Sequence, residues 1–371
     1  MVYLDHNATT PLDPRVFEAM RPYLTTFYGN PSSLHCLGRA ARSAIDTARQ
    51  QVAALVNVEP RQVLFTSGAT EANQWALSLA TQPTPRRLAI SALEHPSLAE
   101  PARQLARRGV SLTILPVDHR GVIDVTALAD LCQTQAPLLL SIMLANNETG
   151  VIQPLATWKT LWQERDIVVH SDAVQAAGKI AVDFQQLGVH ALSLSSHKLY
   201  GPKGCGALVV APSLDVTPLF YGGGQEMGLR AGTENVAAIV GFGRAAELAR
   251  EELADRQCHW QALRKQLEAG LLQMGAVLFS RDALCLANTV QFGIAGQDGE
   301  MLVMQLDRLG FALSSGSACA SGGGEPSPIL LAMHVAPDLA KSAVRVSLGA
   351  QTTHDDIDRF LAALARCLGR A

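Results

Sequence analysis

Residues 138–144 read Leu138-Leu139-Leu140-Ser141-Ile142-Met143-Leu144, the longest of seven short apolar runs in the middle of this chain. The other six runs lie at 63–65, 88–90, 112–115, 167–169, 191–194 and 207–210. Helix-like stretches separate most of them, such as 97–108, 124–135 and 155–165. Continuous apolar strands separated by helices indicate a buried, mostly parallel sheet. The sequence therefore predicts an α/β fold whose ligands bind at the carboxyl ends of the strands.

A second, smaller lobe is expected after this sheet. A long helical region covers 233–272 and leads into the segments 275–280, 288–294, 299–309 and 343–347, with a last helix near 354–367. A chain of 371 residues is long enough for a substantial core and two lobes. The pattern alone does not assign the N-terminal segment 1–11 to either lobe.

Composition excludes several classes of protein. The net charge of −3 and the 48% hydrophobic content fit a globular protein in water and argue against a nucleic-acid surface. No apolar run approaches the roughly 20 residues that span a bilayer, and residues 1–6 lack the features of a signal peptide. Seven irregularly spaced cysteines form neither a disulfide framework nor a Cys-x-x-Cys pair, which favours a reducing cytoplasm and gives no metal ligands.

The stretch 66–73 could hold an anion. It reads Thr66-Ser67-Gly68-Ala69-Thr70-Glu71-Ala72-Asn73, follows the apolar run 63–65 and opens a helix. Small residues at a helix N-terminus let backbone N–H groups reach a phosphate. The alternative is an ordinary helix start capped by Ser67 or Thr70.

Two further strand ends carry ionisable residues. Asp172 ends the run 167–169 and could pair with a protonated pyridine nitrogen, or it could cap the following turn. Lys198 follows the run 191–194, so it could form a Schiff base with a carbonyl cofactor, although most lysines are solvated surface residues.

Neighbouring side chains extend the pattern. Ser195 and His197 could hold a phosphate beside Lys198, and His95 could stack on a flat ring or be structural. Together these strand ends supply an anion cradle, a ring platform, a counter-ion and an imine lysine, the set that pyridoxal phosphate needs. A nicotinamide site is disfavoured because no Gly-x-Gly-x-x-Gly follows the first strand.

Cys319 and Arg345 suggest further chemistry. Cys319 lies in Ser314-Ser315-Gly316-Ser317-Ala318-Cys319, among small residues that give a buried thiol nothing to pack against. Its glycines allow the loop to swing, and a nearby cationic group could favour the thiolate. Arg345 alternates within a predicted strand, where it could be a surface charge or a bidentate clamp on a carboxylate.

Several long motifs in order make the chain resemble the cysteine desulfurases of the NifS/IscS-like group, fold-type I pyridoxal-phosphate enzymes of the class V aminotransferase family. The resemblance runs from residue 3 to residue 349, nearly the whole chain. The motifs that carry it are Tyr3-Leu4-Asp5-His6-Asn7-Ala8-Thr9-Thr10, Asn146-Asn147-Glu148-Thr149-Gly150, His170-Ser171-Asp172-Ala173-Val174-Gln175, Ser196-His197-Lys198, Arg230-Ala231-Gly232-Thr233-Glu234-Asn235 and the stretch ending in Cys319.

The resemblance implies a role for each matching residue. Lys198 forms the Schiff base with pyridoxal 5'-phosphate and moves protons, while His95 stacks on the ring and serves as an acid or base. Asp172 pairs with the ring nitrogen and Gln175 bonds the ring hydroxyl. The phosphate is held by Ala69, Thr70, Ser195 and His197, and by Thr233 of the neighbouring subunit. Asn147 and Arg345 hold the substrate carboxylate.

The resemblance also implies the reaction and its partners. L-Cysteine becomes L-alanine, and its sulfur forms a persulfide on Cys319 for delivery to an acceptor protein, a scaffold or a relay, in iron–sulfur assembly or another sulfur-trafficking pathway. A homodimer with shared sites is expected. Residues 12–255 would form the large domain, and 1–11 with 256–371 the small domain, which carries a mobile cysteine loop at about 314–325. His6 departs from the usual residue of the family, and no role is assigned to it.

Two other functions fit parts of the pattern. A lyase or aminotransferase of the same fold would need no nucleophilic thiol, so Cys319 argues against it. A non-catalytic sulfur-relay subunit would be expected to lack Lys198 or Asp172, and both are present.

Overall fold

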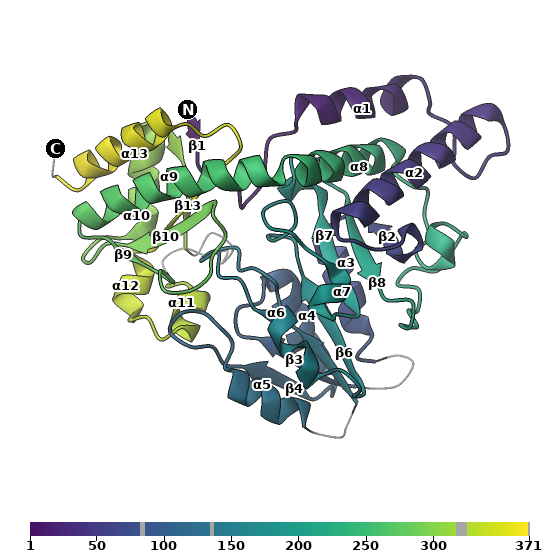
Figure 1. Cartoon of the computed structure of the whole chain (residues 1–371), viewed down its shortest axis with the longest axis horizontal. Helices are drawn as coiled ribbons and strands as arrows, with labels where there is room; N and C mark the ends of the chain where they lie inside the picture. Colours follow the sequence, from purple (N-terminus) through teal and green to yellow (C-terminus); the bar gives the residue numbers. More distant parts are fainter. Residues whose placement is uncertain (82–85, 134–136, 317–324, 370–371) are drawn as a thin grey trace.

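The computed structural model describes residues 1–81, 86–133, 137–316 and 325–369. A seven-stranded sheet forms its centre, in the order β2-β8-β7-β6-β5-β3-β4 (Figure 1). These strands are β2 (Val63–Thr66), β3 (Arg87–Ser91), β4 (Leu112–Leu115), β5 (Leu138–Ser141), β6 (Ile167–Asp172), β7 (Ala191–Ser195) and β8 (Gly206–Val210). β8 runs antiparallel to both β2 and β7, and the pairs from β7 to β4 are parallel. The mostly parallel sheet predicted from the apolar runs is confirmed.

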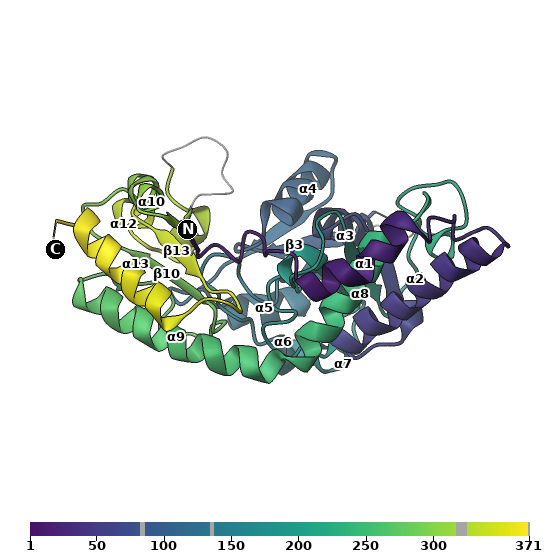
Figure 2. The same cartoon turned by 90° about the horizontal axis from the view of Figure 1, so that it is seen from above.

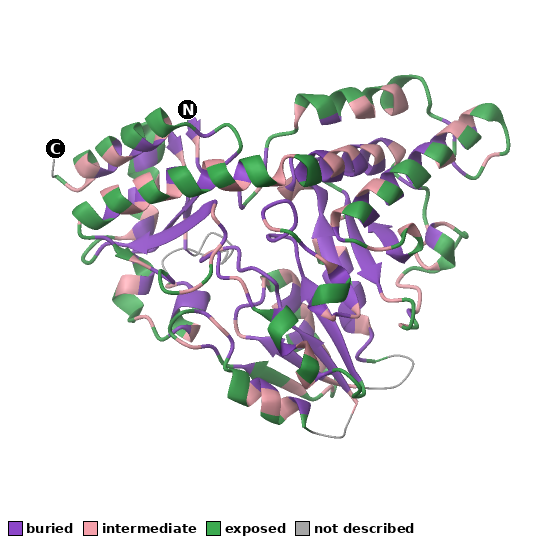
Figure 3. Ribbon diagram, viewed as in Figure 1, coloured by how far each residue is buried: buried purple, intermediate pink, exposed green. Residues whose placement is uncertain are grey.

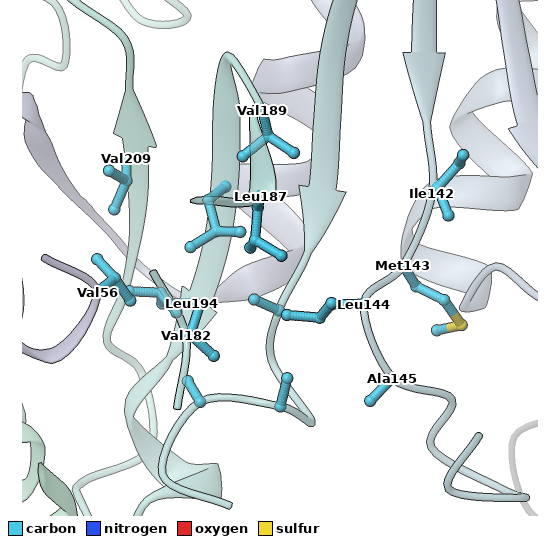
Figure 4. Packing of buried hydrophobic residues seen from close by; sticks show 14 of the residues in the cluster. Val56, Ile142, Met143, Leu144, Ala145, Val182, Leu187, Val189, Leu194 and Val209 are labelled. Carbon is cyan, nitrogen blue, oxygen red and sulfur yellow. The ribbon is translucent and has the colours of Figure 1, made fainter. Parts of the chain in front are cut away.

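Helices cover both faces of this sheet because neighbouring strand residues point to opposite sides. Phe65 packs into one cluster with residues of α2 (Cys36–Leu55), α5 (Val125–Cys132), α6 (Leu155–Trp158), α7 (Phe184–Leu187) and α8 (Val236–Glu251). Leu64 packs into the opposite cluster with α3 (Ala69–Ser78) and α4 (Pro96–Arg107). Figure 3 shows most strands of the sheet buried between helices whose outer surfaces are exposed, whereas the edge strand β4 is partly exposed. Figure 4 shows part of the first cluster, which includes Val56, Leu194 and Val209.

A smaller sheet lies at the other end of the molecule. It contains β12 (Ser314–Ser315), β13 (Val344–Ser347), β10 (Thr289–Gly293) and β9 (Val277–Leu278), in that order. The N-terminal strand β1 (Val2–Tyr3) pairs in parallel with β11 (Phe311–Ala312) close by. The flanking helices are α9 (Leu253–Gln273), α10 (Gly299–Arg308), α11 (Pro328–Ala332), α12 (Pro337–Lys341) and α13 (His354–Cys367). Figure 2 shows α13 lying beside α9.

The hydrophobic clusters can be compared with the two predicted domains. One hydrophobic cluster draws only on residues from 1–11 and 256–371, including Leu4, Trp260 and Phe360. The large cluster, however, also contains Phe279 and Leu330, so the two parts of the chain share apolar contacts. The division at residue 255 therefore stays a prediction.

The long helical region predicted over 233–272 consists of two helices. Asn235 caps α8, and the backbone leaves helical geometry at Glu252 before α9 begins. The break has a packing reason: α8 buries its apolar face in the large cluster, whereas α9 buries Trp260 and Leu267 in the small one. A predicted helix over 155–165 is also shorter, because α6 is followed by the 3₁₀ turn Lys159–Leu161. Of the remaining helical segments, α1 (Pro14–Thr25) packs on α8, and 3₁₀ turns occupy Pro60–Gln62, Ser196–Lys198 and Glu226–Gly228.

Candidate active site

The carboxyl ends of the central strands open into a cavity of about 720 Å³. Ten of the predicted site residues line it: Ala69, Thr70, His95, Asn147, Asp172, Gln175, Ser195, His197, Lys198 and Arg345. They come from six separate segments of sequence: five follow strands of the central sheet, and Arg345 comes from β13 of the smaller sheet. Thr233 does not line the cavity and is exposed. Cys319 lies outside the described residues.

The first turn of α3 forms one wall of the cavity. Gly68 is its N-cap, and among the described residues no side chain caps the helix, so neither Ser67 nor Thr70 plays that part. The first N–H groups of a helix lack intrahelical acceptors, and the helix dipole favours an anion there. The ordinary capped start is thus wrong, and the geometry suits a phosphate. A Cβ at Gly206 would lie 2.7 Å from the Gly68 backbone, so the glycine lets β8 run directly behind this turn.

Asp172 is buried at the end of β6 and receives two hydrogen bonds. Its Oδ1 accepts from Val174 N at 2.9 Å, so it caps the following turn as the alternative prediction held. Its Oδ2 accepts from Asn73 Nδ2 at 2.8 Å. The carboxylate also lines the cavity, so turn capping and contact with a ligand are compatible. The pattern of 66–73 predicts only a backbone cradle and gives no signal for this contact of Asn73.

His95 is the N-cap of α4 and lines the cavity as well. Its Nδ1 accepts from Ser97 N at 3.1 Å and lies 2.7 Å from Ser97 Oγ. Because Nδ1 is an acceptor, the hydrogen of the neutral ring sits on Nε2. Burial lowers the pKa of His95, the charge of Lys198 lowers it further, and Asp172 partly opposes both. The histidine is therefore structural and also placed for contact with a ligand.

Lys198 ends the 3₁₀ turn after β7 and is half-buried, so it is not a solvated surface lysine. Its Nζ donates to the backbone oxygens of Asn7, at 2.5 Å, and Ala8, at 2.7 Å. The neighbouring His197 has its pKa lowered to about 4, first by burial and then by the charges of Lys198 and Lys203. A neutral His197 adds no further positive charge beside the amine.

Asn7 joins several site residues and was not predicted. Its backbone oxygen accepts from Lys198 and, at 3.0 Å, from Gln175 Nε2. Its own Nδ2 donates to Asn147 O at 3.1 Å and to Thr289 Oγ1 at 2.9 Å. The N-terminal segment thus completes the site by bridging the central sheet and the smaller sheet. A single buried asparagine has no sequence pattern that could have revealed this role.

Arg345 on β13 is buried rather than exposed, which excludes the surface-charge alternative. Its Nη1 donates to Asn147 O at 3.0 Å, and its Nη2 forms an ion pair with Asp5 Oδ1 at 2.6 Å. The adjacent Glu148 accepts from Ser327 Oγ at 2.6 Å, and burial raises its pKa. The guanidinium is therefore held in one orientation at the cavity wall, as a carboxylate clamp requires.

His6, whose role was open, is a packing residue. Its Nδ1 donates to Ser347 O at 3.1 Å, and burial lowers its pKa to about 4. A Cβ at Gly349 would lie 2.0 Å from the ring, so the two residues fit together.

A family model, a curated relative and two solved structures all match nearly the whole chain. Residues 2–360 match the family described as Aminotransferase class-V. The chain is 40% identical over 374 residues to "Cysteine desulfurase IscS" of Dictyoglomus turgidum, covering 99% of this chain and 94% of that protein. A solved structure titled "NIFS-LIKE PROTEIN" superimposes with a TM-score of 0.93 at 36% identity, covering all of both chains. A NifS-like protein from Rickettsia africae gives 0.90 at 32% identity, over 100% of this chain and 99% of that one.

Proposed function

This chain belongs to the cysteine desulfurases of the class-V aminotransferase family, and from that premise we propose how its own residues act. The enzyme is pyridoxal-phosphate-dependent and converts L-cysteine to L-alanine, passing the sulfur to an enzyme cysteine. The observation that carries the assignment of roles is the meeting of Lys198, Asp172 and the uncapped α3 turn around one cavity.

The residues around the cavity fit pyridoxal 5'-phosphate. The α3 turn at Ala69 and Thr70, with Ser195 and His197, supplies the donors that a phosphate needs. Asn73 also has a buried side-chain oxygen without a hydrogen bond, close to the Asp172 carboxylate that would meet the ring nitrogen. When bound, the cofactor supplies an aldehyde for amines and a cationic ring that draws electrons from the substrate.

Lys198 and His95 handle the protons in this proposal. Lys198 would hold the cofactor through its amine, and the free amine would serve as the base that takes a proton from the substrate α-carbon and returns it. His95 lines the cavity, where it would meet the ring and offer Nε2–H as a donor. Its lowered pKa keeps the imidazole neutral at pH 7. Asp172 would keep the ring nitrogen protonated, and Gln175 would bond the ring hydroxyl.

Asn147 and Arg345 orient the substrate. The guanidinium is already fixed by Asp5 and by the backbone of Asn147, so little side-chain freedom is lost when a carboxylate binds. When the substrate carboxylate is fixed, the substrate side chain can point in only one direction. The site therefore selects amino acids whose side chain fits in that direction.

We assign the sulfur acceptance to Cys319. Its thiolate attacks the substrate sulfur, an S–S bond forms, and the bond between that sulfur and the β-carbon breaks with its electrons staying on carbon. Protonation of that carbon gives alanine, so atoms and electrons balance without an external oxidant. A sulfur-acceptor protein, either a scaffold or a relay, then takes the sulfane sulfur from Cys319.

A homodimer with shared sites is part of this proposal. Thr233 is exposed and outside its own cavity, which suits contact with the phosphate of a neighbouring subunit. Three ion pairs fix its loop: Arg49–Glu226, Arg42–Glu234 and Arg230–Glu71. Exposed Phe17, Leu24 and Tyr28 on and after α1 give apolar surface for a second copy.

We also propose a cytoplasmic location and the domain division given by the sequence. The described cysteines are all free thiols, as expected in a reducing compartment. Among the described helices, none has the length and apolar character needed to cross a membrane.

The test is a comparison of two cysteine variants. Cys319→Ser is expected to keep the bound cofactor and its visible absorbance but to lose persulfide and alanine formation from L-cysteine. Cys36→Ser, at an exposed thiol on α2, serves as the matched control and is expected to behave as wild type. Full alanine production by Cys319→Ser would overturn the assignment.

A further inference from the structure

A second buried lysine lies beside the cavity and has no part in the mechanism above. Lys179 sits in the turn after β6, where its backbone N–H donates to Ala176 O at 3.0 Å. Its side chain is buried. Within the described ranges, no carboxylate forms an ion pair with its amine. A buried lysine without a carboxylate is costly, so its retention calls for a specific contact.

The contacts of Lys179 are with two side-chain amides. Its Nζ lies 2.5 Å from Gln175 Oε1 and 3.0 Å from Asn7 Oδ1. Gln175 in turn donates Nε2–H to Asn7 O at 3.0 Å. The two bonds fix which way the Gln175 amide faces, because its oxygen is held by an amine and one of its hydrogens by a carbonyl. The second amide hydrogen is left for a group in the cavity, which Gln175 lines.

We propose that Lys179 is a positioning residue, which holds the Gln175 side-chain oxygen away from the cavity so that Gln175 presents N–H to the ring hydroxyl oxygen of the cofactor. The inference rests on the proposed role of Gln175. An ionised ring oxygen needs a donor, and a flipped amide would instead turn a lone pair toward it. Lys179 opposes that flip because turning the Gln175 amide would take the oxygen acceptor away from one N–H group of the amine.

The number of acceptors suits an uncharged Lys179. A neutral amine has two hydrogens, and Gln175 and Asn7 provide two acceptors. Burial, and to a lesser extent the charges of Lys198 and Arg345, lower the pKa of Lys179 well below its ordinary value. Lys179 can therefore orient the amide without placing another positive charge beside Lys198.

A double-mutant cycle on the full-length enzyme tests the proposal. Lys179→Met keeps the length of the side chain and removes the donor. It is expected to weaken pyridoxal 5'-phosphate binding by about tenfold, since one oriented hydrogen bond is lost, and to shift the visible absorption band of the bound cofactor. Lys265→Met, at an exposed position on α9, is the control and should change neither quantity. In a Gln175→Ala background, Lys179→Met should have little further effect, because the proposed route from Lys179 to the cofactor runs through Gln175.

Several outcomes would overturn the inference. If the effects of Lys179→Met and Gln175→Ala on cofactor affinity simply add, Lys179 does not act through Gln175. The same conclusion follows if Lys179→Met leaves both the cofactor affinity and the visible absorption band unchanged. Lys179→Gln keeps a donor and serves as the second variant if Lys179→Met does not fold. Its affinity for the cofactor should lie between those of wild type and Gln175→Ala. If Lys179→Gln lowers the affinity by the same factor in the Gln175→Ala background, the inference is overturned. A wild-type protein that binds the cofactor but makes no alanine would instead overturn the proposed residue roles.

Discussion

Asn73 donates a hydrogen bond to Asp172 across the wall of the cavity, with 2.8 Å between Nδ2 and Oδ2. The same amide nitrogen donates to Ser97 Oγ at 3.0 Å, and Ser97 in turn contacts His95 Nδ1. One asparagine in the second turn of α3 therefore orients both the carboxylate proposed to meet the ring nitrogen and the histidine proposed to stack on the ring. The two residues cannot shift independently while Asn73 holds both.

Replacing Asn73 tests this coupling. In Asn73→Ala the buried Asp172 loses a donor and Ser97 is released, so we expect pyridoxal 5'-phosphate to bind on the order of tenfold more weakly. The dissociation constant is measured by titrating the cofactor-free enzyme. Gln74→Ala, at the exposed neighbouring position of the same helix, is the control and should bind as wild type. Equal affinities of the two variants would contradict the proposed coupling.

Sharing of the active sites between subunits predicts a specific pattern of complementation. Lys198→Ala and Thr233→Val should each be weakly active or inactive as homodimers. In a mixed dimer, the site with an intact Lys198 would receive the intact Thr233 of the other chain. We therefore expect up to half of the wild-type alanine-forming activity to return per mixed dimer, measured on differently tagged, co-purified chains. A Thr233 that served its own site would give no such recovery.

The sequence predicted the strands of the central sheet well because each is a continuous apolar run bounded by polar or small residues. It also placed Asp172 and Lys198 at strand ends, because polar residues that directly follow a buried apolar run lie where the strand leaves the sheet. It predicted a helical region over 233–272 without its break, because nothing in the local pattern marks Glu252, where the break depends on which cluster each half packs against.

The missed site residues share a physical cause. Asn7, Asn73 and Lys179 each form a side-chain hydrogen bond to a partner more than 90 positions away in the sequence. Such bonds depend on the folded arrangement of the backbone and leave no periodicity or spacing in the chain. Gly206 is different in kind: its need for close approach to Gly68 is readable only once β2 and β8 are known to pair.

Glu94 predicts a pH dependence of stability. This carboxyl is buried next to His95, and its Oε1 accepts from Ser91 Oγ at 2.6 Å and Met143 N at 2.7 Å. Burial raises its pKa from 4.5 to about 8, and the nearby Asp172 adds to the effect. Between those values the folded protein holds a proton that the unfolded chain has released. The contribution to the free energy of unfolding is therefore complete below pH 4.5 and is lost as the pH rises to 8.

Glu94→Gln should remove the contribution of Glu94 to the pH dependence of the free energy of unfolding. Glutamine keeps an acceptor for Ser91 and Met143 but cannot ionise. We expect the unfolding midpoint of the variant to fall less than that of wild type between pH 5 and pH 8, measured by thermal melting in matched buffers across the window set by the shifted pKa. Glu100→Gln, on the exposed face of α4, should retain the wild-type slope. Parallel curves for wild type and Glu94→Gln would show that Glu94 ionises in the folded protein.

Arg345→Lys tests the substrate clamp with the charge conserved. The guanidinium serves Asp5 and Asn147 O at once through two nitrogens in a fixed plane, and a substrate carboxylate would need the remaining donors of that plane. A lysine amine is a single point donor and cannot meet all three partners in the same geometry. We therefore expect KM for L-cysteine to rise about tenfold or more, with a smaller change in kcat, because binding of the carboxylate weakens while the proton-transfer residues stay in place. Steady-state alanine formation gives both constants.

Arg359→Lys, at an exposed position on α13, controls for the substitution itself. A variant that lost kcat alone, with KM unchanged, would place Arg345 in the chemical step instead of in substrate binding.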